Sequence, residues 1–149
     1  MPSSWTQNIY HAVFSTKHRL PIITTEIEER LHPFTGGILK DLKCTPVAIN
    51  GTADHIHLLT IFPSDLAISD MLRHVKKRSS EWIHRTFEHR NDFAWQEGYG
   101  GFTVSKSAID DVAEYIRRQK EHHEKFDSLL EFRELLRRHG VQFDSKYLE

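Results

Sequence analysis

The sequence has a single cysteine, Cys44, which excludes an intrachain disulfide and a cysteine-based zinc cluster. Cys44 lies near apolar Val47 and Ile49 in an expected strand, which favours a buried, inert thiol. No apolar run approaches the roughly twenty residues that span a membrane, and residues 1–4 lack the pattern of a signal peptide. We therefore expect a cytoplasmic protein from a reducing compartment, with no membrane association.

The chain also lacks an excess of positive charge, since 20 Lys and Arg against 21 Asp and Glu give a formal net charge of −1. A domain that binds nucleic acid mainly through phosphate contacts is usually strongly basic. The distribution of charge offsets this argument, because residues 68–87 have apolar side chains at helical spacing and a cluster of basic ones. The cluster is Arg73, Lys76, Lys77 and Arg78. It either contacts phosphates or forms a solvated charged face, and both readings stay open.

The size and composition suit one domain with a sizeable core, since 38% of the 149 residues are hydrophobic and 28% are charged. We expect a single domain over residues 1–149, with a core over about residues 5–126 and a helical tail over about residues 127–149. Apolar residues recur among charges in the tail between 129 and 136. This pattern predicts an amphipathic helix that packs on the body of the protein or on a partner.

Two histidines separated by one residue lie in the middle of the chain. Residues 54–59 (DHIHLL) read as a strand, in which successive side chains alternate between the two faces of a sheet. Ile56 then points into a core, while His55 and His57 project together from the opposite face. Histidine is a common metal ligand and also a common surface residue, and the chain has 11 of them. The pair therefore needs further ligands to make a metal site.

Candidates for those ligands come later, in residues 112–123, which contain no glycine or proline and are expected to form a helix. Tyr115 and Gln119 share one face of that helix, so a hydroxyl and an amide oxygen project side by side. His122 returns to the same face, where it could replace Gln119 as a ligand, orient the phenol or contact a phosphate. Alternatively, its ring interacts with the carbonyl groups at the helix end.

These side chains suit one particular chemistry. Two imidazoles and an amide oxygen hold one divalent ion and leave coordination positions open. The ion polarises a phosphoryl oxygen, and a phenol beside it attacks phosphorus to form a phosphotyrosine. The residues thus predict transesterification of a nucleic acid strand. Phosphoryl transfer favours Mg²⁺ or Mn²⁺, and two imidazoles shift the preference toward Mn²⁺.

Four segments of the chain form a specific combination. They are residues 10–17 (YHAVFSTK), 54–59 (DHIHLL), 95–102 (WQEGYGGF) and 115–119 (YIRRQ), the last followed by His122 and His123. A His-hydrophobic-His motif alone is weak, but Tyr-x-x-x-Gln after it, with a glycine-rich segment between, is far more selective. In order and spacing, over roughly residues 5–126, the chain resembles the HUH single-tyrosine transposases of small bacterial insertion sequences, including the REP-associated tyrosine transposases.

The resemblance implies that His55 and His57 bind the metal, that Gln119 is the third ligand and that Tyr115 is the nucleophile. It also implies an obligate homodimer in which the tyrosine helix serves the partner's histidines, so that active sites are shared in trans. We therefore expect a DNA transposase that cleaves and rejoins hairpin-flanked single-stranded DNA through a 5′-phosphotyrosine intermediate. Two alternatives are a domesticated enzyme that nicks repeat hairpins and a non-catalytic DNA-binding regulator with the same fold.

The expected elements alternate in a simple order. Strands are predicted at residues 7–15, 45–50, 55–62 and 102–105, and helices at residues 25–43, 68–87 and around Tyr115. Pro33 and the glycine pair at 36–37 predict a kink or a late start in the first helix. The order βαββαβ indicates an α+β ferredoxin-like sandwich with an antiparallel sheet, to which a C-terminal catalytic helix is added.

Aromatic residues alternate with glycines in the segment 95–102. Trp95, Tyr99 and Phe102 could stack on DNA bases, and the glycines could let a strand approach the backbone. Aromatic residues next to glycines are more often loop anchors that pack on the core. We therefore expect packing first and stacking second for this segment.

Overall fold

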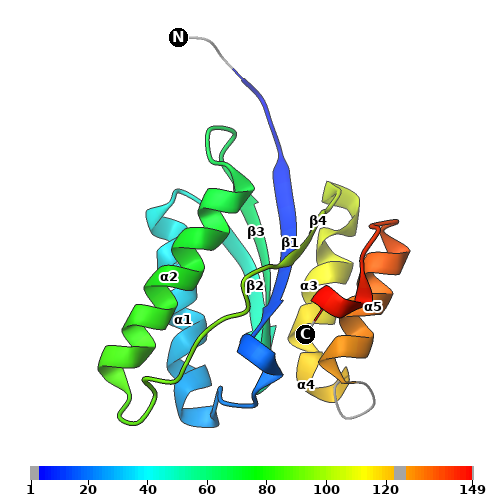
Figure 1. Cartoon of the computed structure of the whole chain (residues 1–149). Coiled ribbons are helices and arrows are strands. Elements are labelled where there is room, and N and C mark those ends of the chain that lie inside the picture. The colour runs from blue at the N-terminus through cyan, green and yellow to red at the C-terminus, as the bar shows by residue number, and fades with distance from the viewer. Residues whose placement is uncertain (1–3, 123–126, 149) are drawn as a thin grey trace.

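The computed structural model describes residues 4–122 and 127–148, and it has one four-stranded antiparallel sheet. The strands are β1 (Asn8–Ser15), β2 (Thr45–Gly51), β3 (His55–Phe62) and β4 (Gly100–Thr103). Their spatial order is β2-β3-β1-β4, with β1 and β3 in the centre. Helix α1 (Thr25–Asp41) follows β1 and helix α2 (Ile68–Thr86) follows β3. This is the ferredoxin-like βαββαβ arrangement, as the sequence predicts (Figure 1).

Helices cover both faces of the sheet. α1 and α2 lie on one face, while α3 (Ile109–Arg117), α4 (Gln119–His122) and α5 (Ser128–Arg138) lie on the other (Figure 1). Short 3₁₀ helices span Lys17–Arg19, Lys106–Ala108 and Ser145–Tyr147. In the part of the chain that the structure describes, no helix has the length and apolar character needed to cross a membrane. The sheet is therefore the middle layer of three.

Strand β3 divides its side chains between these two layers. Ile56 and Leu58 belong to the apolar cluster under α1 and α2. Leu59, on the other face, packs with Ile116 of α3. Because side chains alternate along a strand, His55 and His57 share the face of Leu59 and look toward α3, α4 and α5. The two histidines of β3 therefore point away from the cluster under α1 and α2. They point toward the layer that contains α3, the helix of Tyr115.

Helix α1 begins at Thr25 and continues through Pro33 to Asp41, so the expectation of a late start is wrong. The Thr24 side chain caps the helix by accepting from the Ile27 amide. The physical reason for continuity is burial, because Ile27, Leu31 and Ile38 of the apolar stripe are almost fully buried. Pro33 removes one backbone hydrogen bond on an exposed face, which the packing of the opposite face outweighs.

The segment 95–102, with its aromatic residues and glycines, packs mainly on the core. This is the first of the two expectations for it. Trp95 is buried, donates its indole N–H to Ser79 at 2.9 Å and contacts the ring of Phe14 edge-on. Phe102 is also buried and stacks on His139, whereas Tyr99 stays 38% exposed. Cys44 is a buried free thiol, which confirms the reading of that residue.

Strand β4 begins at Gly100, two residues before the start we expected at 102, because its glycines allow very close packing. A methyl group at Gly101 would overlap the ring of Tyr10, and one at Gly100 would overlap the ring of Phe132 in α5. Phe132 is buried with Val13 and Phe102. The absence of a side chain at Gly100 therefore lets α5 lie close to the sheet.

We predict that Gly100→Ala lowers the free energy of unfolding by about 1–3 kcal/mol, since an added methyl group overpacks a filled site. Gly37→Ala is the matched control, because Gly37 lies in the interior of α1 with open space at its Cβ position. That change should raise the free energy of unfolding by about 1 kcal/mol. Urea unfolding of the three proteins measures both effects, and equal stability of Gly100→Ala and wild type would contradict the packing described for α5.

Candidate active site

The imidazoles of His55 and His57 are both buried, with residue exposures of 2% and 0%. On His55, Nδ1 hydrogen bonds with the Asp54 carboxylate at 2.8 Å and with the Thr52 hydroxyl at 2.9 Å. On His57, Nδ1 hydrogen bonds with Nε2 of His11, from the neighbouring strand β1, at 2.8 Å. These partners fix both rings, and the Nε2 atoms of both histidines face a third side chain.

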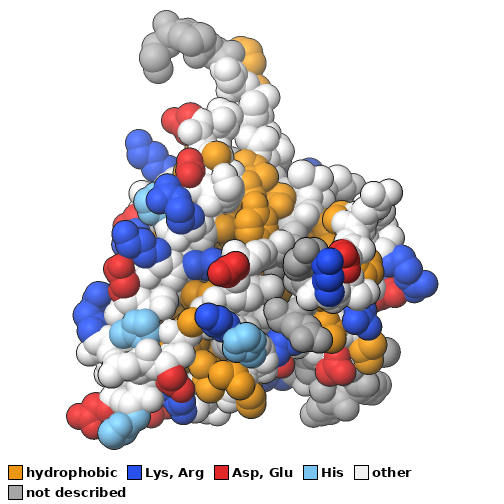
Figure 2. All heavy atoms as spheres, viewed as in Figure 1, with side chains coloured by type: hydrophobic (Ala, Val, Ile, Leu, Met, Phe, Trp, Pro, Cys, Tyr) orange, Lys and Arg blue, Asp and Glu red, His pale blue; other side chains and the backbone are white. Residues whose placement is uncertain are grey.

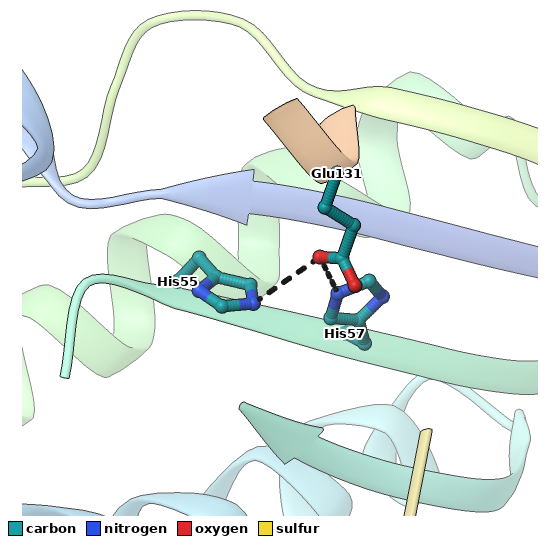
Figure 3. Close-up of side chains that lie close together, drawn as sticks. All are labelled: His55, His57 and Glu131. Atoms are coloured by element: carbon teal, nitrogen blue, oxygen red, sulfur yellow. Dashed lines mark hydrogen bonds and ion pairs between the residues drawn. The ribbon is translucent and has the colours of Figure 1, made fainter. Parts of the chain in front are cut away.

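That third side chain is Glu131 of α5. Its Oε1 lies 2.9 Å from Nε2 of His57 and 3.5 Å from Nε2 of His55. Figure 3 shows the carboxylate reaching down from the helix between the two rings on β3. Within the described residues, these three side chains form a group whose ligand atoms all lie within 4.8 Å of one another. Their chemistry, two imidazole nitrogens and a carboxylate oxygen, suits a divalent ion.

Tyr115 and Gln119 join the same cluster. The Tyr115 hydroxyl donates to Oε2 of Glu131, and the Gln119 amide N–H donates to the same oxygen at 3.0 Å. The side-chain oxygen of Gln119 lies 3.0 Å from Nε2 of His55. The predicted nucleophile, both predicted histidine ligands and the predicted amide ligand are therefore brought together within one chain.

The helix that we expected over residues 112–123 is broken at Arg118, which separates α3 from α4. Asn50 at the end of β2 explains the break. Its amide donates to the carbonyl groups of Ile116 and Arg117, each at 3.0 Å. The last carbonyls of α3 thus find a partner outside the helix, and the chain turns so that the Gln119 side chain is fully buried. Tyr115 and Gln119 still converge, although they no longer share one regular helix.

Charges around the cluster follow from burial and hydrogen bonding. Burial opposes protonation of His55, but hydrogen bonds to Asp54, Glu131 and Gln119 outweigh it and raise the pKa of His55 to about 9. Burial also opposes ionisation of Asp54, yet hydrogen bonds, above all from His55, lower the pKa of that carboxyl. Burial and the adjacent His57 lower the pKa of His11 to about 3, so His11 is neutral near pH 7.

The tyrosine is held in its protonated form. Burial and then the negative charge of Glu131 raise the pKa of Tyr115 above its ordinary value. The phenol therefore donates its hydrogen to Glu131 in this state. Rings of His57 and His11 lie edge-on to it, with centroids 5.8 and 6.4 Å away.

A cavity of about 640 Å³ opens beside Tyr115. Its wall includes His11 and Glu131 on the inner side, and Arg138 and His139 from the end of α5. Asp111 and Glu134 line the cavity as well, and Glu134 pairs with Arg138 at 3.0 Å, so the wall carries charges of both signs. Tyr115 lines this cavity, whereas His55 and His57 do not. A substrate in the cavity could therefore contact the phenol directly.

The predicted basic cluster lies on α2, across the sheet from this site. Figure 2 shows Lys and Arg side chains along the outer side of α2, mixed with acidic and histidine side chains. Lys77 is exposed, and exposed Arg73 pairs with Asp70 at 3.2 Å. Arg78 pairs with Asp41 at 2.7 Å. The cluster is thus partly neutralised by neighbouring acids.

Lys76 has a structural contact that the sequence did not indicate. Its ammonium donates to the backbone carbonyls of Gln96, Glu97 and Gly98 at 2.9, 3.3 and 2.5 Å. It also lies over the ring of Phe14, 5.2 Å from its centre. Burial lowers the pKa of Lys76 to about 8, so the group is still charged at pH 7. Lys76 therefore fastens the loop before β4 to α2.

Sequence reasoning missed Glu131 and His11. Glu131 follows the apolar period of α5, because it lies four residues before Leu135 and next to buried Phe132. An acidic residue inside an apolar helix stripe is a signal of a buried polar contact. His11 has no such signal beyond strand alternation. The remaining candidate, His122, ends α4, and its side chain lies outside the described part of the structure.

Comparison with known proteins gives a consistent picture. Residues 4–119 match the family described as transposase IS200 like. The transposases for insertion sequence element IS200 of Salmonella typhimurium and Salmonella typhi are each 29% identical over 121 residues, which cover 75% of this chain and 76% of theirs.

Two solved structures share the fold. A candidate transposase from Deinococcus radiodurans R1 superposes with a TM-score of 0.65 and 22% identity, over 80% of this chain and 95% of that one. A REP-associated tyrosine transposase bound to a REP hairpin superposes with a TM-score of 0.62 and 14% identity, over 83% of this chain and 73% of that one. At these identities the likeness supports the fold alone.

We predict that Lys76→Met lowers the free energy of unfolding by about 1–2 kcal/mol, because backbone carbonyls lose a charged donor. Lys77→Met is the matched control, since Lys77 is exposed on the same helix and should change stability by no more than about 0.5 kcal/mol. Thermal or urea unfolding measures the difference. Equal stability of the two variants would mean that Lys76 does not hold the loop.

Proposed function

This chain belongs to the family of IS200-like transposases, and on that premise we propose that it cleaves and rejoins single-stranded DNA with Tyr115 as nucleophile. The observation that carries the proposal is the contact of the Tyr115 hydroxyl with a buried cluster of two imidazoles, a carboxylate and an amide. A binding module has no use for a phenol in such surroundings. A strand-transfer enzyme needs one at this position.

In the proposed reaction, the oxygen of Tyr115 forms a bond to phosphorus while the bond from phosphorus to the 3′ oxygen breaks. The phenol loses its proton, and the leaving 3′ oxygen gains one. The product is a 5′-phosphotyrosine and a free 3′-hydroxyl end. Attack by another 3′-hydroxyl reverses these bond changes and rejoins DNA, so no other energy source is required.

We propose that His55 and His57 hold a divalent metal, Mg²⁺ or Mn²⁺, with Gln119 as the third ligand. The donor set supports this, since Nε2 of both rings lies near one oxygen of Glu131 and the amide oxygen of Gln119 lies 3.0 Å from Nε2 of His55, and such donors suit these ions. When bound, the ion supplies charge stabilisation at the phosphoryl oxygen. The hydrogen bonds of His55 with Asp54 and of His57 with His11 orient the two rings for this role.

The proposed substrate is hairpin-containing single-stranded DNA. Its support is the family and the fold shared with a REP-associated transposase that was solved with a REP hairpin. We propose that the α2 cluster of Arg73, Lys76, Lys77 and Arg78 faces DNA phosphates away from the cleavage point. Arg73 and Lys77 are the most exposed of the four, and Lys76 would contribute the charge of an ammonium that is already bonded to the loop at 96–98. The cavity beside Tyr115, with Arg138 at its wall, would take the strand to be cut.

The molecule is proposed to work in the cytoplasm, as a homodimer of one-domain chains that include the tail from residue 127 onward. The family resemblance implies sites shared in trans. However, the Tyr115 hydroxyl here bonds to Glu131 of the same chain, which also contacts both histidines. This contact within one chain supports a cis site, which we propose as the arrangement to test against the shared sites that the resemblance implies. His122 remains a candidate for a metal or phosphate contact.

We predict that Tyr115→Phe abolishes covalent attachment to DNA and leaves binding intact, because the phenyl ring keeps its packing and lacks the attacking oxygen. The test is incubation with a library of hairpin-bearing single-stranded DNA and Mn²⁺, followed by detection of adducts that resist denaturation. Tyr99→Phe is the matched control, since Tyr99 is exposed and outside the cluster. A Tyr115→Phe adduct would refute the nucleophile. Binding without any adduct from wild type would favour a non-catalytic regulator.

A second prediction separates cis from trans sites. Mixing Tyr115→Phe protein with His57→Ala protein should not restore adduct formation, because each chain then lacks one part of its own site. Each variant is first checked for folding by circular dichroism. Adducts in the mixture, linked to the His57→Ala chain, would establish that one chain's tyrosine serves the other's histidines.

A further inference from the structure

The carboxylate of Glu131 connects the proposed metal ligands to the proposed nucleophile. One oxygen, Oε1, faces Nε2 of His57 and of His55 at 2.9 and 3.5 Å. The other, Oε2, accepts from the Tyr115 hydroxyl and from the Gln119 amide. Each oxygen thus has a separate set of partners. A side chain that merely filled space would not need this division.

Helix α5 is built to present this carboxylate. Asp127 caps the helix by accepting from the Leu130 amide at 2.8 Å. The hydroxyl of Ser128 donates to Asp54 at 3.1 Å and accepts from Arg19 at 2.9 Å. Asp54 is also the residue that fixes His55. The start of α5 is therefore tied to the partner of a proposed ligand.

The same helix is held by apolar packing on its next turn. Phe132 is buried with Val13 and Phe102 and fits against Gly100, where no side chain intervenes. Glu131, adjacent to Phe132, is itself only 5% exposed. Its position is thus set from both sides, by the cap and by the ring that follows it.

The chemistry of the cluster favours a cation at its centre. A buried carboxylate must be paired or must coordinate a metal, and Glu131 lies with His55 and His57 in a group whose ligand atoms are all within 4.8 Å of one another. Neighbouring ligands of an octahedral ion, at about 2.1 Å from it and at right angles, lie about 3 Å apart. Two distances in the cluster are of this size. Glu131 Oε1 lies 2.9 Å from Nε2 of His57, and Gln119 Oε1 lies 3.0 Å from Nε2 of His55.

We propose that Glu131 is a ligand of the divalent ion held by His55 and His57, and that its second oxygen positions Tyr115 beside that ion. The inference deepens the proposed function and rests on its metal site. It makes α5 part of the metal centre, although the family match ends at residue 119. It also links metal binding to the order of the C-terminal helix.

The test is a titration of the full chain with Mn²⁺ alone. Electron paramagnetic resonance, which detects free Mn²⁺, and calorimetry measure the affinity. Glu131→Gln keeps the size of the side chain and removes its charge, and we expect Mn²⁺ affinity to fall by at least about tenfold, as for changes close to a metal. Glu131→Asp keeps the charge but shortens the reach, and should weaken binding too. Circular dichroism in chelator checks that each variant is folded.

Glu134→Gln is the matched control, because Glu134 lies one turn along α5 and pairs with Arg137 and Arg138 on the outside. It should bind Mn²⁺ as wild type does. Added Mn²⁺ should raise the Tm of wild type and Glu134→Gln, and raise that of Glu131→Gln much less, because a ligand stabilises only the state that binds it.

Two results would overturn the inference. Equal Mn²⁺ affinity of folded Glu131→Gln and wild type would remove Glu131 from the ligand set and leave the rest of the proposed function intact. If DNA cleavage by Glu131→Gln also increased, the carboxylate would block the substrate position. Failure of wild type to bind Mn²⁺ at all would reject the metal site together with this inference.

Discussion

The burial of polar side chains between the sheet and its C-terminal helices is the constraint on which the rest of the site depends. His55, His57, Gln119 and Glu131 are each no more than 5% exposed, so most of their hydrogen bonds must be made within the protein. They find them in one another and in Asp54, His11 and Tyr115. Such a network is rigid when every member is satisfied, and removal of one member leaves its neighbours unpaired.

This constraint explains features of the fold that propensity alone does not. The helix that carries Tyr115 stops at Arg117 because Asn50 takes its last carbonyls, and the turn that follows buries Gln119. Helix α5 carries an acid in the middle of its apolar stripe because that acid meets two imidazoles. Position 100 accommodates only glycine, because the ring of Phe132 occupies the space that a side chain would need. Each local irregularity serves the position of one polar group.

Much of the fold was predictable from the sequence. The alternation around His55 and His57 and the order of strand and helix signals indicate the ferredoxin-like sheet and the face that carries the histidines. The spacing of Tyr115 and Gln119 indicates that the two polar side chains lie close together, although the helix breaks between them at Arg118. These features depend on periodicity within short segments, which a sequence displays directly.

The remaining features depend on contacts between distant segments. Neither the pairing of His11 with His57 nor the hold of Lys76 on the loop at 96–98 follows from any local pattern. Glu131 differs, since its place in the apolar stripe of α5 indicates a buried polar contact, but no local pattern indicates that its partners lie on β3, α3 and α4. The sequence showed that basic residues cluster near Arg73. It did not show that this cluster lies on the opposite face of the sheet from the site.

The most direct test of the account is identification of the residue that becomes linked to DNA. Wild-type protein is incubated with a cleavable hairpin single strand and Mn²⁺, digested with trypsin and nuclease, and analysed by mass spectrometry. The account predicts a 5′-phosphonucleotide on Tyr115, in the peptide of residues 107–117. A modification on Tyr10, Tyr99 or Tyr147 instead, or cleaved DNA with no modified peptide, would contradict it.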